Sequence, residues 1–289
     1  MASTRQLKGR IRSVKSTKQI TKAMQMVAAS KMRRAQDATK ATSDYTRTAN
    51  ELLTYLSSQG ATKQHPLFEK RVVKGRLLIV IAADKGLAGA YNANILKEYI
   101  RALREDDAEG IRNETIAVGR KASQFVTRLK DTELCGTYTD IPDDPEGAEF
   151  YAILTTACAM FEEGKIDAAD IIYTKFVSSM TQVAVTERIL PAGFVKTEVT
   201  EFVRDAVYEP SVEVVLEGVV RRLVGSKIFQ ALLDARASEH SMRMLAMKNA
   251  TDNASELAED LTLEMNKARQ AAITQELAEI SGGAEAMKG

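Results

Sequence analysis

The sequence has 289 residues, enough for roughly two domains of about 150 residues each, which excludes a peptide hormone or a mini-protein. Its 40 Lys and Arg balance 39 Asp and Glu to a net charge of +1, so bulk charge does not draw the molecule to nucleic acid. The two cysteines, Cys135 and Cys158, exclude a disulfide framework and suit a reducing compartment. The longest apolar run, Leu77–Ala83, is far shorter than the roughly 18 residues of a membrane-spanning helix, so we expect no direct membrane span.

The N-terminal segment, residues 1–58, predicts one long helix over Thr4–Ser58. Neither Gly nor Pro occurs between Arg10 and Gln59, so the two residues that most often interrupt helices are missing there. Apolar side chains recur every three or four residues, and the register shifts between stripes predict a stripe that winds around the helix. These stripes are Leu7, Ile11 and Val14; Ile20, Met24 and Val27; Ala28, Met32 and Ala35; and Tyr45, Ala49, Leu52 and Leu56.

The strongest local charge lies at the start of this helix, where residues 1–36 contain ten basic side chains and no acid. A mitochondrial transit peptide has a similar composition, but the helical pattern continues to Leu56, which a removable leader does not need. A nucleic-acid-binding arm is a second interpretation, but the first aromatic residue is Tyr45, so this stretch offers nothing for bases to stack on. The third interpretation is a basic shaft that faces acidic protein surfaces.

The middle section, residues 76–195, changes to a mixed pattern that is typical of an α/β, Rossmann-like domain. A continuous apolar run with branched side chains predicts a strand buried on both faces, and helical and strand patterns then alternate. A short polar link, residues 178–181, predicts a hairpin between the last two strands. The predicted strands are Arg76–Ala83, Thr115–Val118, Ala169–Val177 and Gln182–Ile189, and the predicted helices are Asn92–Ala108, Lys121–Leu129 and Pro145–Glu163.

The residues of this section give weak support for chemistry. The turn Asp84–Gly89 follows the first strand, but it has neither the repeated glycines nor the lysine of a nucleotide-binding loop, which favours a structural turn. We predict that His240 lies on a solvated or interfacial face, because its neighbours in a helix point in other directions and cannot form a triad with it. We read the acidic pairs, Asp106–Asp107 and Asp143–Asp144, as solvated charge. We therefore expect no catalytic, cofactor-binding or metal site.

The C-terminal segment, residues 211–281, predicts a second long helix with apolar positions that include Ala254, Leu257 and Leu261. The two helices would be roughly 80 Å and 105 Å long, and propensity alone cannot hold such lengths in water. Each must bury its stripe against a partner, so the sequence favours a long antiparallel coiled coil of the N- and C-terminal helices. A helical bundle broken by short loops is the alternative. The last helix exceeds the first by about 16 residues, or roughly 24 Å.

Three blocks of sequence at the two ends are more specific than any single motif. The block Thr17–Arg34 closely resembles the signature near the start of the gamma subunit of F-type ATP synthases. The blocks Met247–Ala254 and Asn266–Leu277 resemble two recognisable blocks near the end of the same family. Length and order match along the whole chain.

The resemblance implies a rotor shaft of the central stalk. In that family the terminal helices form a coiled coil inside a ring of three alpha and three beta subunits, and the α/β domain is a foot on the membrane c-ring. Flow of protons or sodium ions turns the ring and the shaft, and the asymmetric shaft drives the beta sites through different nucleotide affinities. The chain is then a non-catalytic subunit without a cofactor, and the epsilon subunit is a further partner.

The resemblance also implies contact residues at matching positions. Lys18, Lys22 and Met24 match positions near an acidic lever loop of a beta subunit. A second set matches positions that meet a catch loop or lie in a family motif on the shaft: Arg243, Arg269, Gln270, Thr274 and Glu276. Tyr208 and Glu209 match the foot that contacts the ring and the epsilon subunit. The turn Gly86–Ala90 departs from the family pattern, which puts only the detail of that turn in question.

The expected location is the cytoplasmic side of a bacterial cell membrane, as a peripheral part of a complex, because the sequence shows no leader before the family pattern. No cysteine pair of the chloroplast type occurs, so thiol switching is not expected. An α/β enzyme and a nucleic-acid-binding coiled coil are the alternatives from other functional classes.

Overall fold

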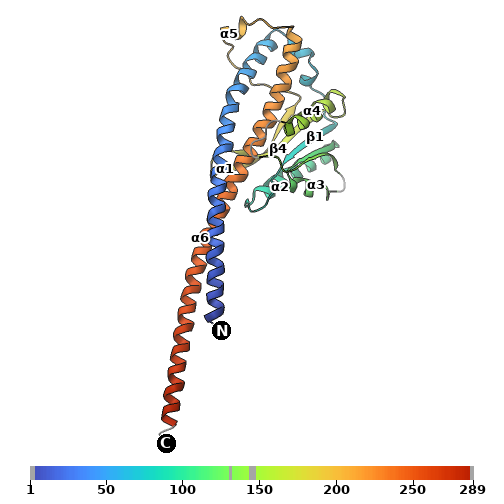
Figure 1. Cartoon of the computed structure of the whole chain (residues 1–289). Coiled ribbons are helices and arrows are strands. Elements are labelled where there is room, and N and C mark those ends of the chain that lie inside the picture. The colour runs from blue at the N-terminus through green and yellow to red at the C-terminus, as the bar shows by residue number, and fades with distance from the viewer. Residues whose placement is uncertain (1–3, 130–131, 143–147, 287–289) are drawn as a thin grey trace. The chain divides into compact units, whose positions relative to one another are not determined.

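The computed structural model describes residues 4–129, 132–142 and 148–286. Contacts divide the chain into two compact units. Unit 1 consists of residues 1–27 and 244–289, and unit 2 of residues 28–243. Unit 1 contains the outer parts of two long helices, and unit 2 contains the sheet (Figure 1).

The two long helices are α1, Thr4–Ser58, and α6, Val212–Ala286. The first has the predicted bounds, and the second begins one residue after the predicted start and continues past the predicted end at Ser281. The long stretches without Gly or Pro let both helices run unbroken. Among the described residues, no helix combines the length and the apolar character that a membrane crossing requires.

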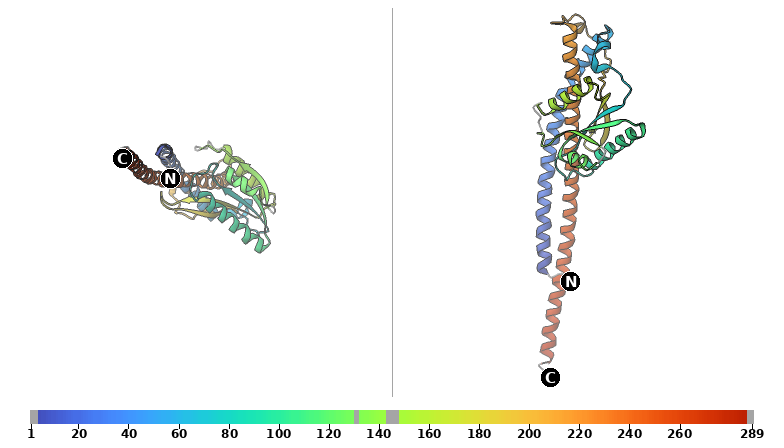
Figure 2. Two further views of the ribbon diagram at one scale, coloured as in Figure 1. Left: turned by 90° about the horizontal axis from the view of Figure 1, so that it is seen from below. Right: turned by 90° about the vertical axis from the view of Figure 1, so that its right-hand side faces the viewer.

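In unit 1 the two helices pack in opposite directions. Leu7 and Ile11 form a buried cluster with Leu261, whereas Thr21, later in α1, bonds Thr251, earlier in α6, with 2.8 Å between their Oγ1 atoms. Residue numbers of the contacting pairs increase along α1 while they decrease along α6. The two helices are therefore antiparallel, which confirms this part of the fold prediction. The end of α6 continues beyond the first turn of α1 in Figure 1 and in the right-hand view of Figure 2.

The seam between these helices keeps a seven-residue period, with alternating steps of mostly four and three residues. Small side chains occupy its middle, which lets the two backbones approach closely. On α1 its buried or half-buried members are Leu7, Ile11, Val14 and Thr21, and on α6 they are Met247, Thr251, Ala254, Ala258, Leu261 and Met265.

The predicted winding stripe is wrong in unit 1. Ile20 and Val27 are 58% and 56% exposed, and the buried place belongs to Thr21, which continues the period of Leu7 and Val14. Adjacent positions are about 100° apart on a helix, so Ile20 points away from the seam. The prediction took apolar character as the sign of burial. At this point of the seam, however, the buried residue of α1 is Thr21, which bonds Thr251, and the apolar Ile20 beside it is exposed.

Unit 2 is built on a five-stranded sheet with the order β3-β2-β1-β4-β5. Strands β1 to β4 run parallel and β5 is antiparallel to β4, which confirms the predicted α/β class and the terminal hairpin. The strands are β1 Gly75–Ile81, β2 Arg112–Val118, β3 Glu133–Tyr138, β4 Ala168–Phe176 and β5 Gln182–Leu190.

Edge strand β3, one short helix and two 3₁₀ turns were not predicted. Strand β3 alternates exposed and half-buried residues and contains Gly136, so it lacks the apolar run that marked the other parallel strands. The remaining helices are α2 Tyr91–Glu109, α3 Arg120–Val126, α4 Ala148–Glu162 and α5 Glu201–Arg204, with 3₁₀ turns at Ala61–Gln64 and Pro66–Phe68. Of these, α2, α3 and α4 correspond to the three predicted helices of this section, whereas α5 and the two 3₁₀ turns were not predicted. Residues 145–147 of the predicted helix from Pro145 lie outside the described residues, as does the acidic pair Asp143–Asp144.

Helices cover both faces of the sheet. Alternate residues of β1 point to opposite sides: Leu78 and Val80 pack in a cluster with α2 and α3, and Leu77 and Ile79 in a cluster with α4, the end of α1 and the first part of α6. Figure 2 shows these helices beside the sheet from two further directions. The near-continuous apolar strands follow from this double coverage.

The prediction of solvated charge at Asp106 is wrong. Asp106 is only 1% exposed, and its Oδ1 lies 2.8 Å from Arg76 Nη1. Arg76 Nε also lies 3.5 Å from Asp170 Oδ2, and Arg188 pairs with Asp170 from the neighbouring strand. A turn-like sequence concealed a buried ion cluster, because burial there depends on the start of β1 packing against the end of α2.

Burial raises the pKa of Asp106 to about 6, and burial also raises the pKa of Asp234 to about 6. A carboxyl group with a raised pKa stabilises the folded state fully below about pH 4, and this contribution is lost as the pH rises through about 6. We expect the Asp106→Asn variant to lose about 2 kcal/mol of the pH dependence of unfolding free energy between pH 4 and 6.5. Urea unfolding of the purified chain at several pH values measures it.

The exposed neighbour Asp107 provides the matched control. Asp107→Asn should leave the pH profile of the unfolding free energy parallel to that of the unsubstituted chain. A parallel profile for Asp106→Asn as well would show that burial does not hold this carboxyl group in its protonated form.

Candidate functional site

The carboxyl edge of the sheet is where a ligand-binding or catalytic site of this fold class would lie. Open α/β sheets bind ligands where the strand order reverses, outside the carboxyl ends of the strands, and here that point lies between β1 and β4. Next to this point, beside the carboxyl ends of β1 and β2, the remaining space is about 10 Å³, and its lining includes Tyr91 from α2 and Leu232 and Glu239 from α6. Side chains of α6 fill the crevice that a nucleotide would need.

Asp84 occupies the position at which such folds hold a phosphate. Its Oδ1 accepts hydrogen bonds from the backbone N–H of Arg120, at 2.9 Å, and of Asp140, at 3.1 Å. Arg120 is the first residue of α3, so the carboxylate caps a helix N-terminus that would otherwise attract an anion. The chain therefore supplies its own negative charge at this turn, in agreement with the predicted structural role of the turn Asp84–Gly89.

Segment 236–243 of α6 carries the polar side chains of this edge. Glu239, which is buried, lies between Arg236 and Arg243, with N–O distances of 3.2 Å and 2.7 Å. Arg236 also donates to the carbonyl of Ile141 at 2.6 Å, and Arg243 to that of Gly86 at 3.3 Å. The guanidinium of Arg243, a predicted contact residue, is thus already bound within unit 2.

His240, for which we predicted a solvated or interfacial face, belongs to the same segment. It is buried, so the solvated alternative is wrong. Its Nδ1 lies 3.3 Å from Arg243 Nη1. Burial followed from the packing of α6 against the sheet, where residues 223–235 are all buried except Lys227, Phe229 and Gln230, which are half-buried. The sequence placed Asp84 in a structural turn but did not indicate that it caps α3, and it gave no role to Arg236. The spacing of Arg236, Glu239 and Arg243 along one helical side was a usable signal.

Gly119 makes close packing at this edge possible. It has a φ of +91°, and a Cβ there would lie 2.0 Å from the carbonyl oxygen of Ala82. We expect Gly119→Ala to lower the unfolding free energy by about 3 kcal/mol or more, through backbone strain and overlap together. Gly110, with a φ of +69° and open space around it, is the control, and Gly110→Ala should cost about 1 to 2 kcal/mol. Equal losses in urea unfolding would contradict the assigned overlap.

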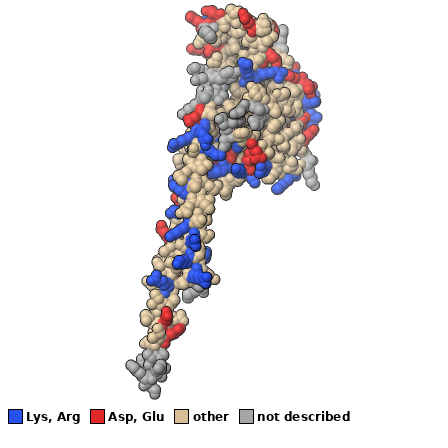
Figure 3. Space-filling model, viewed as in Figure 1, with Lys and Arg blue, Asp and Glu red and all other residues tan. Residues whose placement is uncertain are grey.

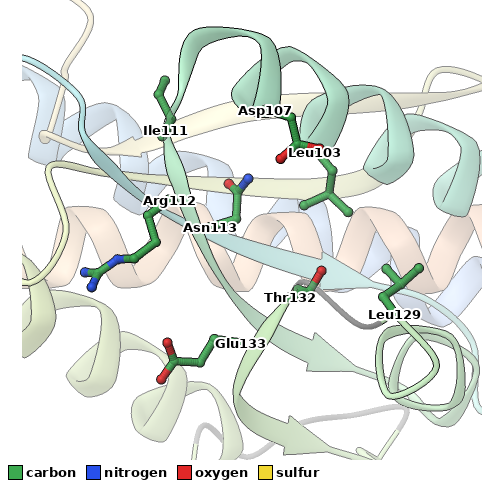
Figure 4. A pocket seen from close by; sticks show the side chains of 8 residues that line it. All are labelled: Leu103, Asp107, Ile111, Arg112, Asn113, Leu129, Thr132 and Glu133. Carbon is green, nitrogen blue, oxygen red and sulfur yellow. The ribbon is translucent and has the colours of Figure 1, made fainter.

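A hollow of about 600 Å³ lies at the opposite edge of the sheet, between the end of α2 and the starts of β2 and β3 (Figure 4). Arg112, at its rim, is already bound, because it donates to the carbonyl of Lys165 at 2.8 Å and pairs with Glu114 at 3.2 Å. Because the hollow lies at the amino ends of β2 and β3, it is away from the edge where this class of sheet binds ligands. Its lining is Leu103, Asp107, Ile111, Arg112, Asn113, Leu129, Thr132 and Glu133.

The predicted contact residues of α1 lie on the surface of unit 1. Lys18 and Lys22 are exposed and four residues apart, so they share one side of the helix, and Met24 is half-buried. Lys22 Nζ donates to Gln25 Oε1 at 3.3 Å. Every basic side chain of α1 within unit 1 is exposed, and Lys and Arg gather along the helical pair on the face shown in Figure 3. This basic surface carries no acidic residue of α1.

The predicted contact residues of α6 also lie in unit 1, and Arg269, Gln270, Thr274 and Glu276 are all exposed. All described side chains from Arg269 to Ser281 are exposed, including three large apolar ones at helical spacing. These three, which we call the apolar stripe, are Ile273, Leu277 and Ile280, with exposures of 46%, 62% and 64%.

Tyr208 and Glu209, the predicted foot residues, lie in unit 2 before the start of α6. The hydroxyl of Tyr208 donates to the carbonyl of Val203 at 2.9 Å, and its ring stacks on Tyr55 with 6.2 Å between centroids. Glu209 is exposed and precedes a cis peptide bond to Pro210. The structure thus fixes the tyrosine internally and leaves the glutamate free to face a partner.

Comparison with known sequences gives consistent results along the whole chain. A family model described as ATP synthase matches residues 3–287. An ATP synthase gamma chain from Moorella thermoacetica is 43% identical over 288 residues and is covered completely, as is this chain. An ATP synthase gamma chain from Stenotrophomonas maltophilia is 40% identical over 288 residues, which span 99% of this chain and all of the relative.

Solved structures show the same fold at lower identity. A chain of the Euglena gracilis mitochondrial ATP synthase, solved with OSCP, F1 and the c-ring in rotational state 3, matches with a TM-score of 0.67 and 22% identity. The match covers 98% of this chain and 94% of that one. A chain from the central stalk and c-ring of the Tetrahymena thermophila enzyme matches with a TM-score of 0.59 and 24% identity, over 80% and 99% of the two chains. These matches confirm the fold class.

Proposed function

This chain belongs to the ATP synthase gamma chain family, and we propose that it is the central-stalk rotor that couples ion flow through a membrane ring to nucleotide turnover. One observation carries the proposal beyond family membership. The apolar stripe Ile273, Leu277 and Ile280 is exposed, on a stretch of α6 where every described side chain is exposed. Contiguous apolar surface of this kind marks an interface, so the stripe needs an external surface around it.

The surface that suits the stripe is the inside of a ring of three alpha and three beta subunits. Charges are sparse on this stretch of α6, and only Glu276 and Glu279 carry one between Ala271 and Ser281. Each hydrogen bond to a surrounding sleeve would add a barrier of about 1 kcal/mol to turning. An apolar tip can turn without such barriers, which is the property that a rotating shaft requires.

The basic side of α1 suits a different contact. Lys18 and Lys22 are placed to meet an acidic loop of a beta subunit, with Met24 beside them, and the charges act at contact range because salt screens them beyond about 10 Å. Arg269, Gln270, Thr274 and Glu276 are the proposed contacts with a second loop nearer the tip. The predicted contact of Arg243 with the surrounding ring stays a prediction. Its guanidinium already binds Glu239 and the Gly86 carbonyl, so the structure gives this contact no added support.

In unit 2, Glu209 and the neighbourhood of Tyr208 form the proposed foot, in contact with the membrane c-ring and the epsilon subunit. The coupling ion is a proton or a sodium ion. The chain itself is non-catalytic, because its crevice is filled by α6, and the nucleotide sites belong to the beta subunits. The complex is attached to a bacterial cell membrane on its cytoplasmic side, and this chain is a peripheral part of it.

Substitution of Lys18 and Lys22 by Gln tests the proposed contact with an acidic loop. Loss of two exposed ion pairs costs about 1 kcal/mol in total, so we expect ion-driven ATP synthesis by the purified complex in vesicles to fall about fivefold. The residual rate should depend less on ionic strength than that of the unsubstituted complex. Both lysines are exposed, so unit 2 should stay folded.

Lys70 and Lys97 provide a matched pair for control, because both are exposed lysines of unit 2. Their double substitution by Gln should leave synthesis and its salt dependence unchanged. An unchanged rate in the Lys18 and Lys22 variant would refute the assigned contact.

The non-catalytic role has its own test. The purified chain, free of beta subunit, should release no phosphate from ATP above the rate of a buffer blank. Turnover that co-purifies with this chain through size exclusion would instead place a reaction centre within it.

A further inference from the structure

The way α6 is held at the carboxyl edge of the sheet points to a mechanical use of the filled crevice. Segment 236–243 is bonded to the loops around it on two sides. Positions on a helix turn by about 100° per residue, so Arg236 and Arg243 lie on one side and Ser238 and Ser241 on nearly the opposite side. All four residues, and the loops that they bind, belong to unit 2.

The arginine side binds the loops that follow β1 and β3. Arg236 donates to the carbonyl of Ile141 at 2.6 Å and lies 3.8 Å from Asp84, which in turn accepts the N–H groups of Arg120 and Asp140. Arg243 donates to the carbonyl of Gly86. Charge-assisted bonds of this kind are about twice as strong as neutral ones, and the side chains of Arg236 and Asp84 are little exposed, which limits the screening of their attraction.

The serine side binds the end of β4 and the hairpin that follows it. The buried hydroxyl of Ser238 donates to the carbonyl of Thr174 at 3.0 Å, and that of Ser241 donates to the carbonyl of Ser179 at 2.7 Å. Gln182, the first residue of β5, donates from Nε2 to the same Ser241 hydroxyl at 3.2 Å. Loops after three different strands are thus fixed to less than three turns of one helix.

We propose that segment 236–243 is a two-sided clamp that makes the sheet and α6 turn as one body, with Arg236, Ser238 and Ser241 as its positioning residues. Apolar packing is non-directional, so directional bonds add a resistance to turning of the helix about its axis that comes on top of the resistance from close packing. Directional bonds on opposite sides resist such a turn, because rotation in either sense breaks both sets. This inference rests on the proposed rotor function, in which torque passes between the ring-bound foot and the long helix.

The test replaces Arg236 by Gln in one complex, and Ser238 and Ser241 by Ala in another. Pumping of the coupling ion, proton or sodium, per ATP hydrolysed is measured in vesicles, and amide hydrogen exchange is measured at residues 84–90 and 139–141. In both variants we expect ATP hydrolysis to continue and pumping per ATP to fall about threefold or more. Exchange at those loops should rise about tenfold in the Arg236 variant, as expected for the loss of a charge-assisted bond.

Arg71→Gln is the matched control. Arg71 also donates to a backbone carbonyl, that of Phe161 at 2.8 Å, and pairs with a carboxylate, Glu69, but neither partner belongs to α6. It should leave pumping per ATP unchanged. Faster hydrogen exchange with unchanged pumping per ATP would show that the clamp only stabilises the loops, and this result would overturn the proposal. No change in either hydrogen exchange or pumping would overturn it as well. If the unsubstituted chain itself supports no coupled pumping, the proposed rotor function fails instead. Should the Arg236 variant not assemble, the serine variant decides.

Discussion

The burial of a narrow seam between α1 and α6 is the constraint on which unit 1 depends. Neither helix can persist at such a length in water by propensity alone, so each needs the other along the seam. Small residues in the middle of the seam bring the backbones close, and the Thr21–Thr251 hydroxyl pair is a polar contact inside it. A polar pair in an apolar seam fixes register better than another apolar pair would, because a slipped register would leave buried hydroxyl groups facing apolar partners.

The same seam explains which side chains are left for other molecules. Because the buried positions keep a seven-residue period, apolar residues outside that period, such as Ile20 and Val27, are displaced to the surface. Past the seam, α6 continues alone and exposes its apolar stripe. In unit 2 the reverse holds for residues 223–243 of α6: none of them is exposed, and this part of the helix fills the crevice that an α/β enzyme would use for a ligand. The two halves of one helix thus have opposite roles, one as a core element and one as a surface.

Much of this fold was predictable from the sequence, and the failures share a cause. Long stretches without Pro and Gly predicted both helices to within a few residues, and branched apolar runs predicted β1 and β4. Strand β3 was missed because an edge strand buries too little to show an apolar run. Asp106 and His240 are buried by packing between distant segments, which the residues around each of them in the sequence do not reveal. For the contact residues, the resemblance at both ends supplied positions that periodicity could not, and the roles of Arg236 and Asp84 escaped notice because they arise only when the loops meet α6.

Direct observation of rotation tests the central claim most sharply. The alpha and beta ring would be fixed to a surface, and a bead would be attached through Val72→Cys, at a side chain of this chain that is largely exposed. On addition of ATP the account predicts that the bead turns in one direction and pauses three times per turn, once for each beta subunit. A bead that stays still, or that only fluctuates, while the same complexes hydrolyse ATP would contradict the claim that this chain is the shaft.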